Sequence, residues 1–325
     1  MPPRRAADDS TLTLIVAGDV LLDRGVRKRI TAVGADRLFD GTRRTFRNAD
    51  AVLVNLECAA TDNPSPFEKM FVFRAEPEWV GALRRSGITH ADLANNHAVD
   101  HGPDGFVATM EHLRAYGLVP VGGGPSQDSA CSPVTVNASG VAVALFATVL
   151  LPLENWMHNP AGPGPCQASV EETADRIRRW KSVHPCGHAV AVLHWGREYQ
   201  PHPTEGQRAA AALLAEAGAD IVIGHHPHVA QSIERIGETM VVYSTGNFVF
   251  DQSRPETRRC FAVELTWRGC RRATVALIPF LITDCSPRPM TKREAGVFRS
   301  MLLDLSEGIA LGPYRQGKIS VIRSD

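Results

Sequence analysis

Short apolar runs alternate with amphipathic stretches along this chain of 325 residues, from Leu12 to about Leu305, and this alternation restricts the possible folds. The runs are short and rich in Val, Ile and Leu, which is typical of buried strands in an α/β protein. We expect strands at 12–17, 51–55, 88–93, 141–148, 189–193, 220–223, 240–244, 261–266 and 273–282.

The stretches between the expected strands carry signals for helix starts. Three of them begin with a capping-box pair, in which two side chains satisfy free backbone N–H groups at the helix start. The pairs are Ser169 with Glu172, Thr204 with Gln207, and Thr291 with Glu294. Alternating strands and helices predict α/β architecture. The hairpin-like stretch 261–282 indicates that the sheet is mixed.

The charge balance argues against two classes of protein. The chain has 35 Lys and Arg against 35 Asp and Glu, so it lacks the basic excess of a nucleic-acid binder or a polybasic membrane-surface protein. The most apolar stretch, 141–153, is interrupted by Thr148 and Pro152 and falls short of the roughly 20 residues that span a bilayer. We therefore expect no nucleic-acid partner and no membrane segment.

The seven cysteines are odd in number and scattered, and no pair forms C-x-x-C. This pattern predicts reduced thiols in a cytoplasmic protein. The first ten residues lack the apolar core of a signal peptide.

We expect a single domain over 12–310, a disordered tail at 1–11 and a C-terminal tail at 311–325. The Pro/Gly-rich segment 152–165, with Trp156 and His158, is interpreted as a functional loop, with an interdomain linker as the alternative.

Polar side chains follow the expected strands at the point where each strand ends. They are Asp19, Glu57, Asn96 with His97, His194, and His226 with His228. Open α/β sheets gather their ligand-binding loops at the carboxyl ends of the strands. Carboxylate, amide and imidazole groups are ligands for Zn, Mn and Fe. The residues together predict a shared metal site.

Each of these residues also has a purely structural interpretation. His194 fits a hydrogen-bonded core histidine, Glu57 a helix cap and Asn96 a turn residue. The two histidines around Pro227 fit a turn that the proline fixes. The metal site is the stronger interpretation because the residues recur after five strands.

Six motifs occur in order along the chain: GDVLLDR (18–24), NLE (55–57), ANNHAVDHG (94–102), HWGREY (194–199), GADIVIGHHPHV (218–229) and YSTGNFVFDQ (243–252). Together they resemble the CapA family, the capsule or poly-γ-glutamate biosynthesis branch of the calcineurin-like metallophosphoesterases. The resemblance implies a metallophosphoesterase-like sandwich of two mixed β-sheets flanked by helices, in four layers ordered αββα. It also implies metal ions at the strand ends, which in the wider superfamily form a pair with a bridging hydroxide.

The resemblance carries over residue by residue. It implies one or two divalent ions, Mn, Fe or Zn, with His225 as a neighbour and with these ligands: Asp19, Glu57, Asn96, His194, His226 and His228. Two positions depart from the superfamily pattern. Leu21 stands where a histidine ligand is usual, and Asp23 is a candidate replacement. Glu57 stands for an aspartate, and its longer side chain changes the reach of the carboxylate.

The resemblance further implies phosphoester hydrolysis by a metal-bound hydroxide. His97 is the expected general acid, oriented by Asp100 or Asp92. Arg24 is a candidate phosphate donor, with an ordinary ion pair as the alternative. Residues expected around the ligands or the substrate are Asp23, Glu198, Tyr199 and Asn247.

Two other functions are compatible with the same motifs. One is a soluble enzyme of a capsule-like or other amide-forming pathway that acts on glutamyl or amide substrates. The other is a non-catalytic binding module, which the intact histidines disfavour. In each case we expect a small-molecule or polymer substrate of anionic character, and no sequence feature indicates an oligomeric state.

Overall fold

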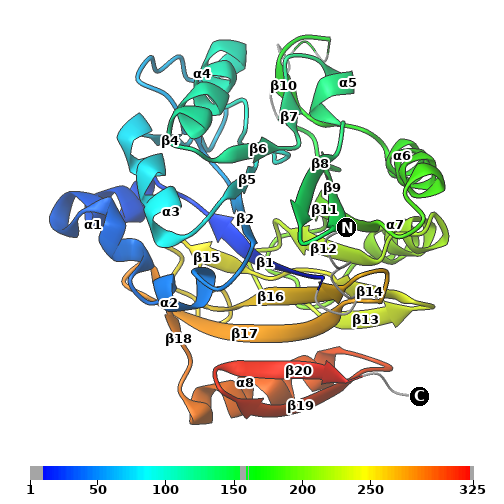
Figure 1. The fold of residues 1–325 in the computed structure, drawn as a ribbon. Coiled ribbons are helices and arrows are strands. Elements are labelled where there is room, and N and C mark those ends of the chain that lie inside the picture. The colour runs from blue at the N-terminus through cyan, green and yellow to red at the C-terminus, as the bar shows by residue number, and fades with distance from the viewer. Residues whose placement is uncertain (1–9, 154–158, 160, 323–325) are drawn as a thin grey trace, which may run out of the picture.

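Two β-sheets pack face to face in the computed structural model, which describes residues 10–153, 159 and 161–322 (Figure 1). Among these residues, ten strands form the larger sheet. In spatial order they are β19 (Ala310–Arg315), β20 (Lys318–Ile322), β17 (Thr274–Thr283), β16 (Arg259–Arg268), β1 (Thr11–Val20), β2 (Ala51–Leu56), β5 (His90–Asp92) and β6 (Val119–Val121), with β15 (Asn247–Val249) beside β1 and β18 (Ser286–Pro289) beside β17. β1, β2, β5 and β6 run parallel, whereas β16 and β17 form an antiparallel hairpin, so the sheet is mixed as predicted.

The smaller sheet has six strands within the described part of the chain. In spatial order they are β13 (Ile233–Ile236), β14 (Thr239–Val242), β12 (Ile221–His225), β11 (His188–His194), β9 (Val141–Val149) and β8 (Val134–Ala138). Its four inner strands are parallel and its two edge strands are antiparallel to them. Two short pairs lie outside the sheets: β3 (Ala59–Ala60) with β4 (Arg74–Ala75), and β7 (Gly123–Gly124) with β10 (Gly164–Pro165).

Helices cover the outer faces of both sheets (Figure 1). Those over the larger sheet are α1 (Arg24–Val33), α2 (Arg43–Phe46), α3 (Val80–Ser86) and α4 (Gly102–Ala115). The smaller sheet is covered by α6 (Val170–Val183) and α7 (Glu205–Glu216), and the remaining helices are α5 (Gln127–Ala130) and α8 (Lys292–Leu305). The three predicted capping boxes form at the starts of α6, α7 and α8. Within the described ranges, the helices are too short or too polar to cross a membrane.

The alternation of side chains along the strands builds the layers. In β1, Leu14 and Val16 enter the core between the two sheets, whereas Ile15 and Ala17 enter the core beneath α1, α3 and α4. This follows because successive side chains of a strand point to opposite faces. β11 alternates in the same way between the inter-sheet core and the core beneath α6 and α7. The predicted four-layer αββα sandwich is therefore confirmed.

The C-terminal region differs from the predicted tail. Residues 310–322 form β19 and β20, and β20 pairs with β17 through Ile319 and Leu277. Leu311 and Ile319 are buried in the inter-sheet core, so apolar burial holds this short hairpin on the sheet edge. The predicted N-terminal tail lies outside the described residues up to position 9, as do Trp156 and His158 of the predicted loop.

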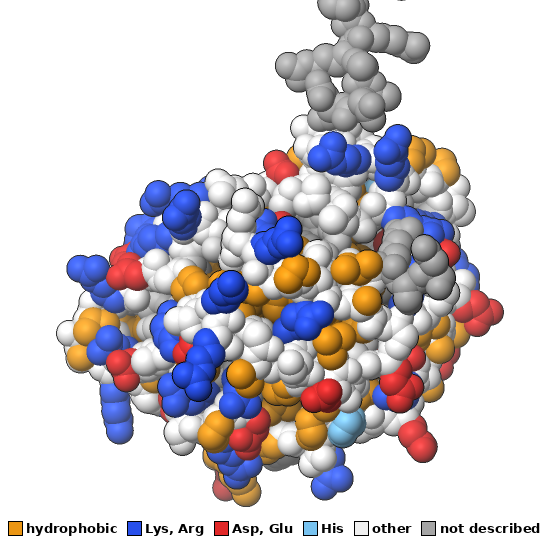
Figure 2. Space-filling view, turned by 90° about the horizontal axis from the view of Figure 1, so that it is seen from below, with side chains coloured by type: hydrophobic (Ala, Val, Ile, Leu, Met, Phe, Trp, Pro, Cys, Tyr) orange, Lys and Arg blue, Asp and Glu red, His pale blue; other side chains and the backbone are white. Residues whose placement is uncertain are grey.

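Ion pairs lie on the end of the molecule where α8, β19 and β20 are found. Figure 2 shows Lys and Arg side chains there interspersed with acidic and apolar ones. Lys318 pairs with Glu264 at 2.6 Å, and Arg288 pairs with Glu294 at 2.7 Å. The basic side chains of this face are thus mixed with acidic partners and do not form one continuous tract.

The prediction of reduced cysteines is wrong for four of the seven. Disulfides join Cys131 to Cys166 and Cys186 to Cys270, with Cα–Cα distances of 4.8 and 4.6 Å. The pairs are 35 and 84 residues apart in sequence. Local spacing cannot reveal such pairs, because the turn between β16 and β17 meets the end of α6 only in the folded chain.

Free-thiol counting tests the two disulfides. We expect denatured, unreduced protein to react with about three equivalents of a thiol reagent, because Cys58, Cys260 and Cys285 are free. Treatment with a reductant before the assay raises the count to all seven cysteines. Seven reactive thiols without reductant, in protein purified under air, would contradict the pairing.

Candidate metal centre

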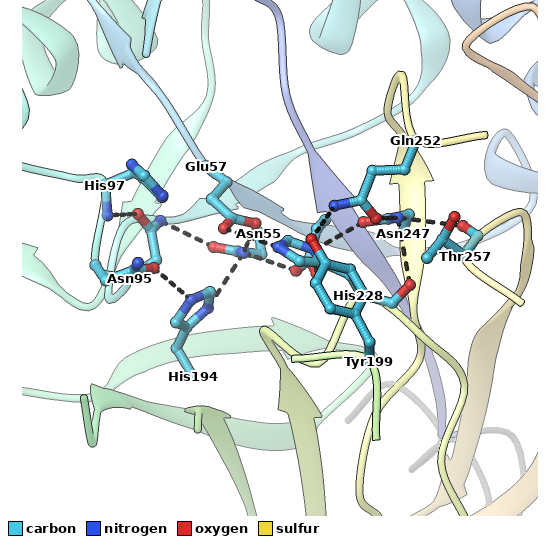
Figure 3. A network of polar contacts seen from close by, with 12 residues as sticks. Asn55, Glu57, Asn95, His97, His194, Tyr199, His228, Asn247, Gln252 and Thr257 are labelled. Atoms are coloured by element: carbon cyan, nitrogen blue, oxygen red, sulfur yellow. Dashed lines mark hydrogen bonds and ion pairs between the residues drawn. The ribbon is translucent and has the colours of Figure 1, made fainter. Parts of the chain in front are cut away.

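The candidate site lies where the carboxyl ends of parallel strands from both sheets meet. In the larger sheet, strand register places Asp19 of β1 opposite Asn55 of β2 and opposite Asn247 of β15. In the smaller sheet, His194 of β11 lies opposite His225 of β12. Figure 3 shows side chains from these strands pointing toward one another. Strand order and register alone bring residues more than 200 positions apart into one cluster.

Two groups of potential metal ligands share one carboxylate. The first group is Asp19, Glu57 and His228, and the second is Glu57, His194 and His226. In each group the ligand atoms lie within 4.8 Å of one another, and all five side chains are buried. Glu57 belongs to both groups, so its carboxylate is available to either of them.

The donor atoms fit divalent ions such as Mn, Fe or Zn. Carboxylate oxygens and imidazole nitrogens suit all three metals. Asp19 Oδ2 and His226 Nδ1 are buried and have no hydrogen-bond partner, which is costly for polar atoms unless another partner compensates. The nearest cationic group to Asp19 Oδ2 is His228 Nδ1, at 3.3 Å. A bound cation would satisfy these atoms.

The ionisation of the cluster reflects its burial. Burial, together with the charge of Asp19, raises the pKa of Glu57 well above its usual value. Burial lowers the pKa of His226 to about 3. Burial also acts against the charge on His228, but Glu57 and Asp19 outweigh it and raise the pKa of His228 to about 9. A protonated His228 therefore lies beside the carboxyl groups of Asp19 and Glu57, and the electrostatic environment of the site stabilises positive charge.

Asparagine side chains hold the cluster in place. Asn55 Nδ2 donates to Asp19 Oδ1 at 2.8 Å and lies 3.4 Å from Glu57 Oε2. Asn96 Oδ1 lies 2.9 Å from His194 Nε2. Asn247 Oδ1 lies 2.9 Å from the His228 Nδ1 atom, opposite the Nε2 atom that faces Glu57. Asn96, a predicted ligand, and Asn247, a predicted neighbour of the ligands, both lie in the cluster.

His97 and Asp100 form a buried pair beside the cluster. His97 Nδ1 lies 2.8 Å from Asp100 Oδ2, and the His97 ring packs on Phe73 with the centroids 4.2 Å apart. Lys69 Nζ lies 2.6 Å from the other oxygen of Asp100. Burial lowers the pKa of His97, and the charge of Asp100 opposes this shift. Of the two predicted orienting residues, Asp100 contacts His97, whereas Asp92 accepts a backbone hydrogen bond elsewhere.

Asp23 does not replace the histidine that Leu21 lacks. Its Oδ1 atom accepts from the backbone N–H of Arg24 and from Arg27 Nε, both at 2.8 Å. Its Oδ2 atom accepts from the backbone N–H of Arg74, also at 2.8 Å. Both carboxylate oxygens are therefore used to cap α1 and to fix the neighbouring strand β4, and Asp23 belongs to neither donor group.

Arg24 and Glu198 lie at the rim of the site. Arg24 Nη2 pairs with Asp251 Oδ1 at 3.1 Å, and its guanidinium lies 5.7 Å from the centroid of the Phe73 ring. Glu198 is exposed, and its charge contributes to the raised pKa of Glu57. Both predicted residues are therefore near the cluster without belonging to it.

Unusual backbone angles concentrate at this site. Arg24, Tyr199, His226 and His228 adopt positive φ values of 57°, 61°, 94° and 59°. Non-glycine residues rarely adopt this conformation, and such residues cluster at functional sites. At His226 and His228 the unusual angles lie on both sides of Pro227 and direct both imidazoles into the cluster.

Sequence reasoning missed several polar residues around the ligands. They are Asn55, Lys69, Asn95 and Gln252. Asn55 could have been identified from the sequence, because its side chain lies on the same side of β2 as that of Leu53, which faces the inter-sheet core. Lys69 could not, because it lies in a loop and reaches Asp100 only in the folded chain.

Known proteins resemble this chain over most of its length. A family model described as "Bacterial capsule synthesis protein PGA_cap" matches residues 13–252. The capsule biosynthesis protein CapA of Bacillus anthracis is 29% identical over 98% of this chain and 79% of its own length. The PGA biosynthesis protein CapA of Bacillus subtilis is 31% identical over 90% of this chain and 77% of its own.

A solved structure shows the same fold. The putative 5′-nucleotidase of Staphylococcus aureus superposes with a TM-score of 0.53 at 14% identity, over 90% of this chain and 58% of its own. At this identity the similarity concerns the fold alone, and it agrees with the predicted metallophosphoesterase-like sandwich.

Metal stoichiometry tests the shared carboxylate. We expect about two ions per chain by elemental analysis of protein loaded with Mn²⁺ or Zn²⁺, because there are two donor groups. His194→Ala and His228→Ala should each lose about one ion, since each residue belongs to one group. Glu57→Ala should lose both.

The exposed His202 provides the control, because it lies outside both groups. His202→Ala should bind as much metal as the unmodified protein. Equal losses in the Glu57→Ala and His194→Ala proteins, with both still folded by circular dichroism, would rule out a bridging role for Glu57.

Proposed function

The chain belongs to the family described as bacterial capsule synthesis protein PGA_cap, and we propose that it is a metal-dependent hydrolase of phosphoesters. The observation that carries the proposal is the pair of buried donor groups sharing Glu57, with the His97–Asp100 pair beside them. Paired metal sites of this kind serve in-line displacement at phosphorus in phosphatases and nucleases.

The ligand residues have one task in this proposal. Asp19, Glu57, His194, His226 and His228 would hold the ions, with Asn96 beside His194. Bound divalent ions supply a Lewis acid for a phosphoryl oxygen and lower the pKa of water toward neutrality. The asparagines fix the orientation of the ligands, a support that contributes to metal affinity.

His97 would deliver a proton to the leaving oxygen. Its Nδ1 atom is held by Asp100 at 2.8 Å, so Nε2 is the atom free to donate. The carboxylate of Asp100 stabilises the protonated imidazole and so opposes, without cancelling, the lowering of the His97 pKa by burial. Phe73 packs against the ring and restricts its rotation. Arg24, at the rim, would bind a phosphoryl oxygen.

A second candidate function is hydrolysis or formation of a glutamyl amide. The observation in its favour is the description of the relatives, which names PGA and capsule biosynthesis. The same cluster would then act on an amide carbonyl.

The cysteines also bear on where either reaction takes place. Disulfides persist mainly in oxidising compartments, so the cysteines of this chain do not support a cytoplasmic location.

A substrate panel separates the two functions. We expect metal-loaded protein to release phosphate from phenyl phosphate or nitrophenol from a nitrophenyl phosphodiester, and not to cleave γ-glutamyl amides. Cleavage of the amides alone would replace the first function by the second. Addition of a chelator should abolish the activity, and the activity should return with Mn²⁺ or Zn²⁺.

Leaving-group dependence tests His97. His97→Gln should lower kcat for an alkyl or phenyl phosphate by about 10²-fold or more. It should affect 4-nitrophenyl phosphate much less, because a stable phenolate leaves without a proton. Asp100→Asn should show the same selectivity with a smaller loss, and His202→Gln should match the unmodified protein. An equal loss on both esters, with metal content unchanged, would exclude a general acid role.

A further inference from the structure

The segment after β15 ties together both sides of the candidate site. Residues 251–254, here called the strap, begin with Asp251, whose Oδ2 atom accepts from the backbone N–H of Gly25 at 2.9 Å. Gln252 Nε2 donates to the Tyr199 hydroxyl, and Gln252 Oε1 accepts from Asn247 Nδ2, both at 3.0 Å (Figure 3). The strap therefore links the start of α1, the loop after β11 and the asparagine that holds His228.

The strap pairs with one arginine, Arg24, and ends with another, Arg254, and each guanidinium lies over an aromatic ring. The guanidinium of Arg24 pairs with Asp251 and lies 5.7 Å from the Phe73 ring, which packs on His97. The guanidinium of Arg254 lies 4.9 Å from the Tyr199 ring, whose centroid is 6.2 Å from that of His228. The Arg24 guanidinium thus lies near the proposed general acid, and the Arg254 guanidinium lies near His228.

The two arginines differ in how their charge is balanced. Arg24 has a carboxylate partner on the strap. Arg254 is exposed, and no carboxylate oxygen of the described residues lies within 4.0 Å of its guanidinium. A guanidinium that is oriented by an aromatic ring keeps its N–H donors available for a planar oxyanion. Arg254 therefore presents a positioned positive charge beside the metal centre.

We propose that Arg254 is a specificity-determining residue that binds a second anionic group of the substrate, a carboxylate or a phosphate, next to the group that reacts at the metal centre. This inference rests on the proposed function, because it assumes that the cluster holds the reacting ester. It narrows the substrate class to molecules with at least two anionic groups, either small molecules or repeating polyanions.

Matched esters test the inference. The probes are phenyl phosphate, 4-carboxyphenyl phosphate and 1,4-phenylene bisphosphate, which differ only in the second anionic group. Arg254→Gln should raise KM for the carboxylated ester, the bisphosphate or both by about tenfold, with kcat nearly unchanged, as expected for loss of a charge-assisted hydrogen bond. Phenyl phosphate should change by less than about twofold. The two esters with a second anionic group distinguish carboxylate from phosphate recognition.

Two further variants control for charge and for position. Arg254→Lys should retain part of the preference, because lysine keeps the charge but lacks the planar fork and the ring stacking. Arg179→Gln removes an exposed arginine on α6 and should leave all three KM values unchanged. Equal effects of Arg254→Gln on all three esters, or no effect on any, would overturn the inference.

A binding measurement keeps the inference separate from the proposed function. Calorimetry with metal-loaded protein compares phenylphosphonate, 4-carboxyphenylphosphonate and 1,4-phenylenebisphosphonate, none of which needs to be hydrolysed. Tighter binding of either compound with a second anionic group, lost in Arg254→Gln, would support the subsite even if no ester is cleaved and the hydrolase proposal fails. The same affinity for all three compounds, or a preference that survives Arg254→Gln, would overturn the subsite.

Discussion

Burial of two carboxyl groups, Asp19 and Glu57, at the meeting of two sheets is the constraint on which the rest of the site depends. Each lies almost fully out of contact with solvent, and an uncompensated buried charge is very costly. The protein compensates in part with Asn55 and with a protonated His228. Bound cations would complete the compensation. The carboxyl groups whose burial is costly are thus the ones that make this cluster a candidate metal site.

The sandwich topology explains why these groups can meet. The parallel strands of each sheet end at one edge, and the inter-sheet core aligns the two edges. Side chains from β1 and from the loop after β2 then face side chains from β11 and from the loop after β12. Positive φ angles at His226 and His228 then direct these two imidazoles into the cluster. Asp251 and Gln252 close the arrangement by linking α1 to Tyr199.

The sequence was sufficient for the mixed α/β class and for most of the residues in the cluster, because both follow from local patterns. The four layers were implied by the resemblance to the CapA family. Alternation identified the buried strands, and polar residues at their ends identified Asp19, Glu57 and the histidines. Contacts between distant segments were beyond its reach. The pairing of Cys186 with Cys270 and the ion pair of Lys69 with Asp100 depend on how loops pack. Asp23 shows the same difficulty, because a helix-capping carboxylate looks the same in sequence as a metal ligand.

The most direct test of this account is a crystal structure of the protein loaded with Mn²⁺ or Zn²⁺, with diffraction data collected at the absorption edge of the metal. The account predicts two anomalous peaks, one beside Asp19 and His228 and one beside His194 and His226, with the Glu57 carboxylate contacting both. A single peak, or two peaks with Glu57 turned away from either, would contradict the bridging role on which the proposed chemistry rests.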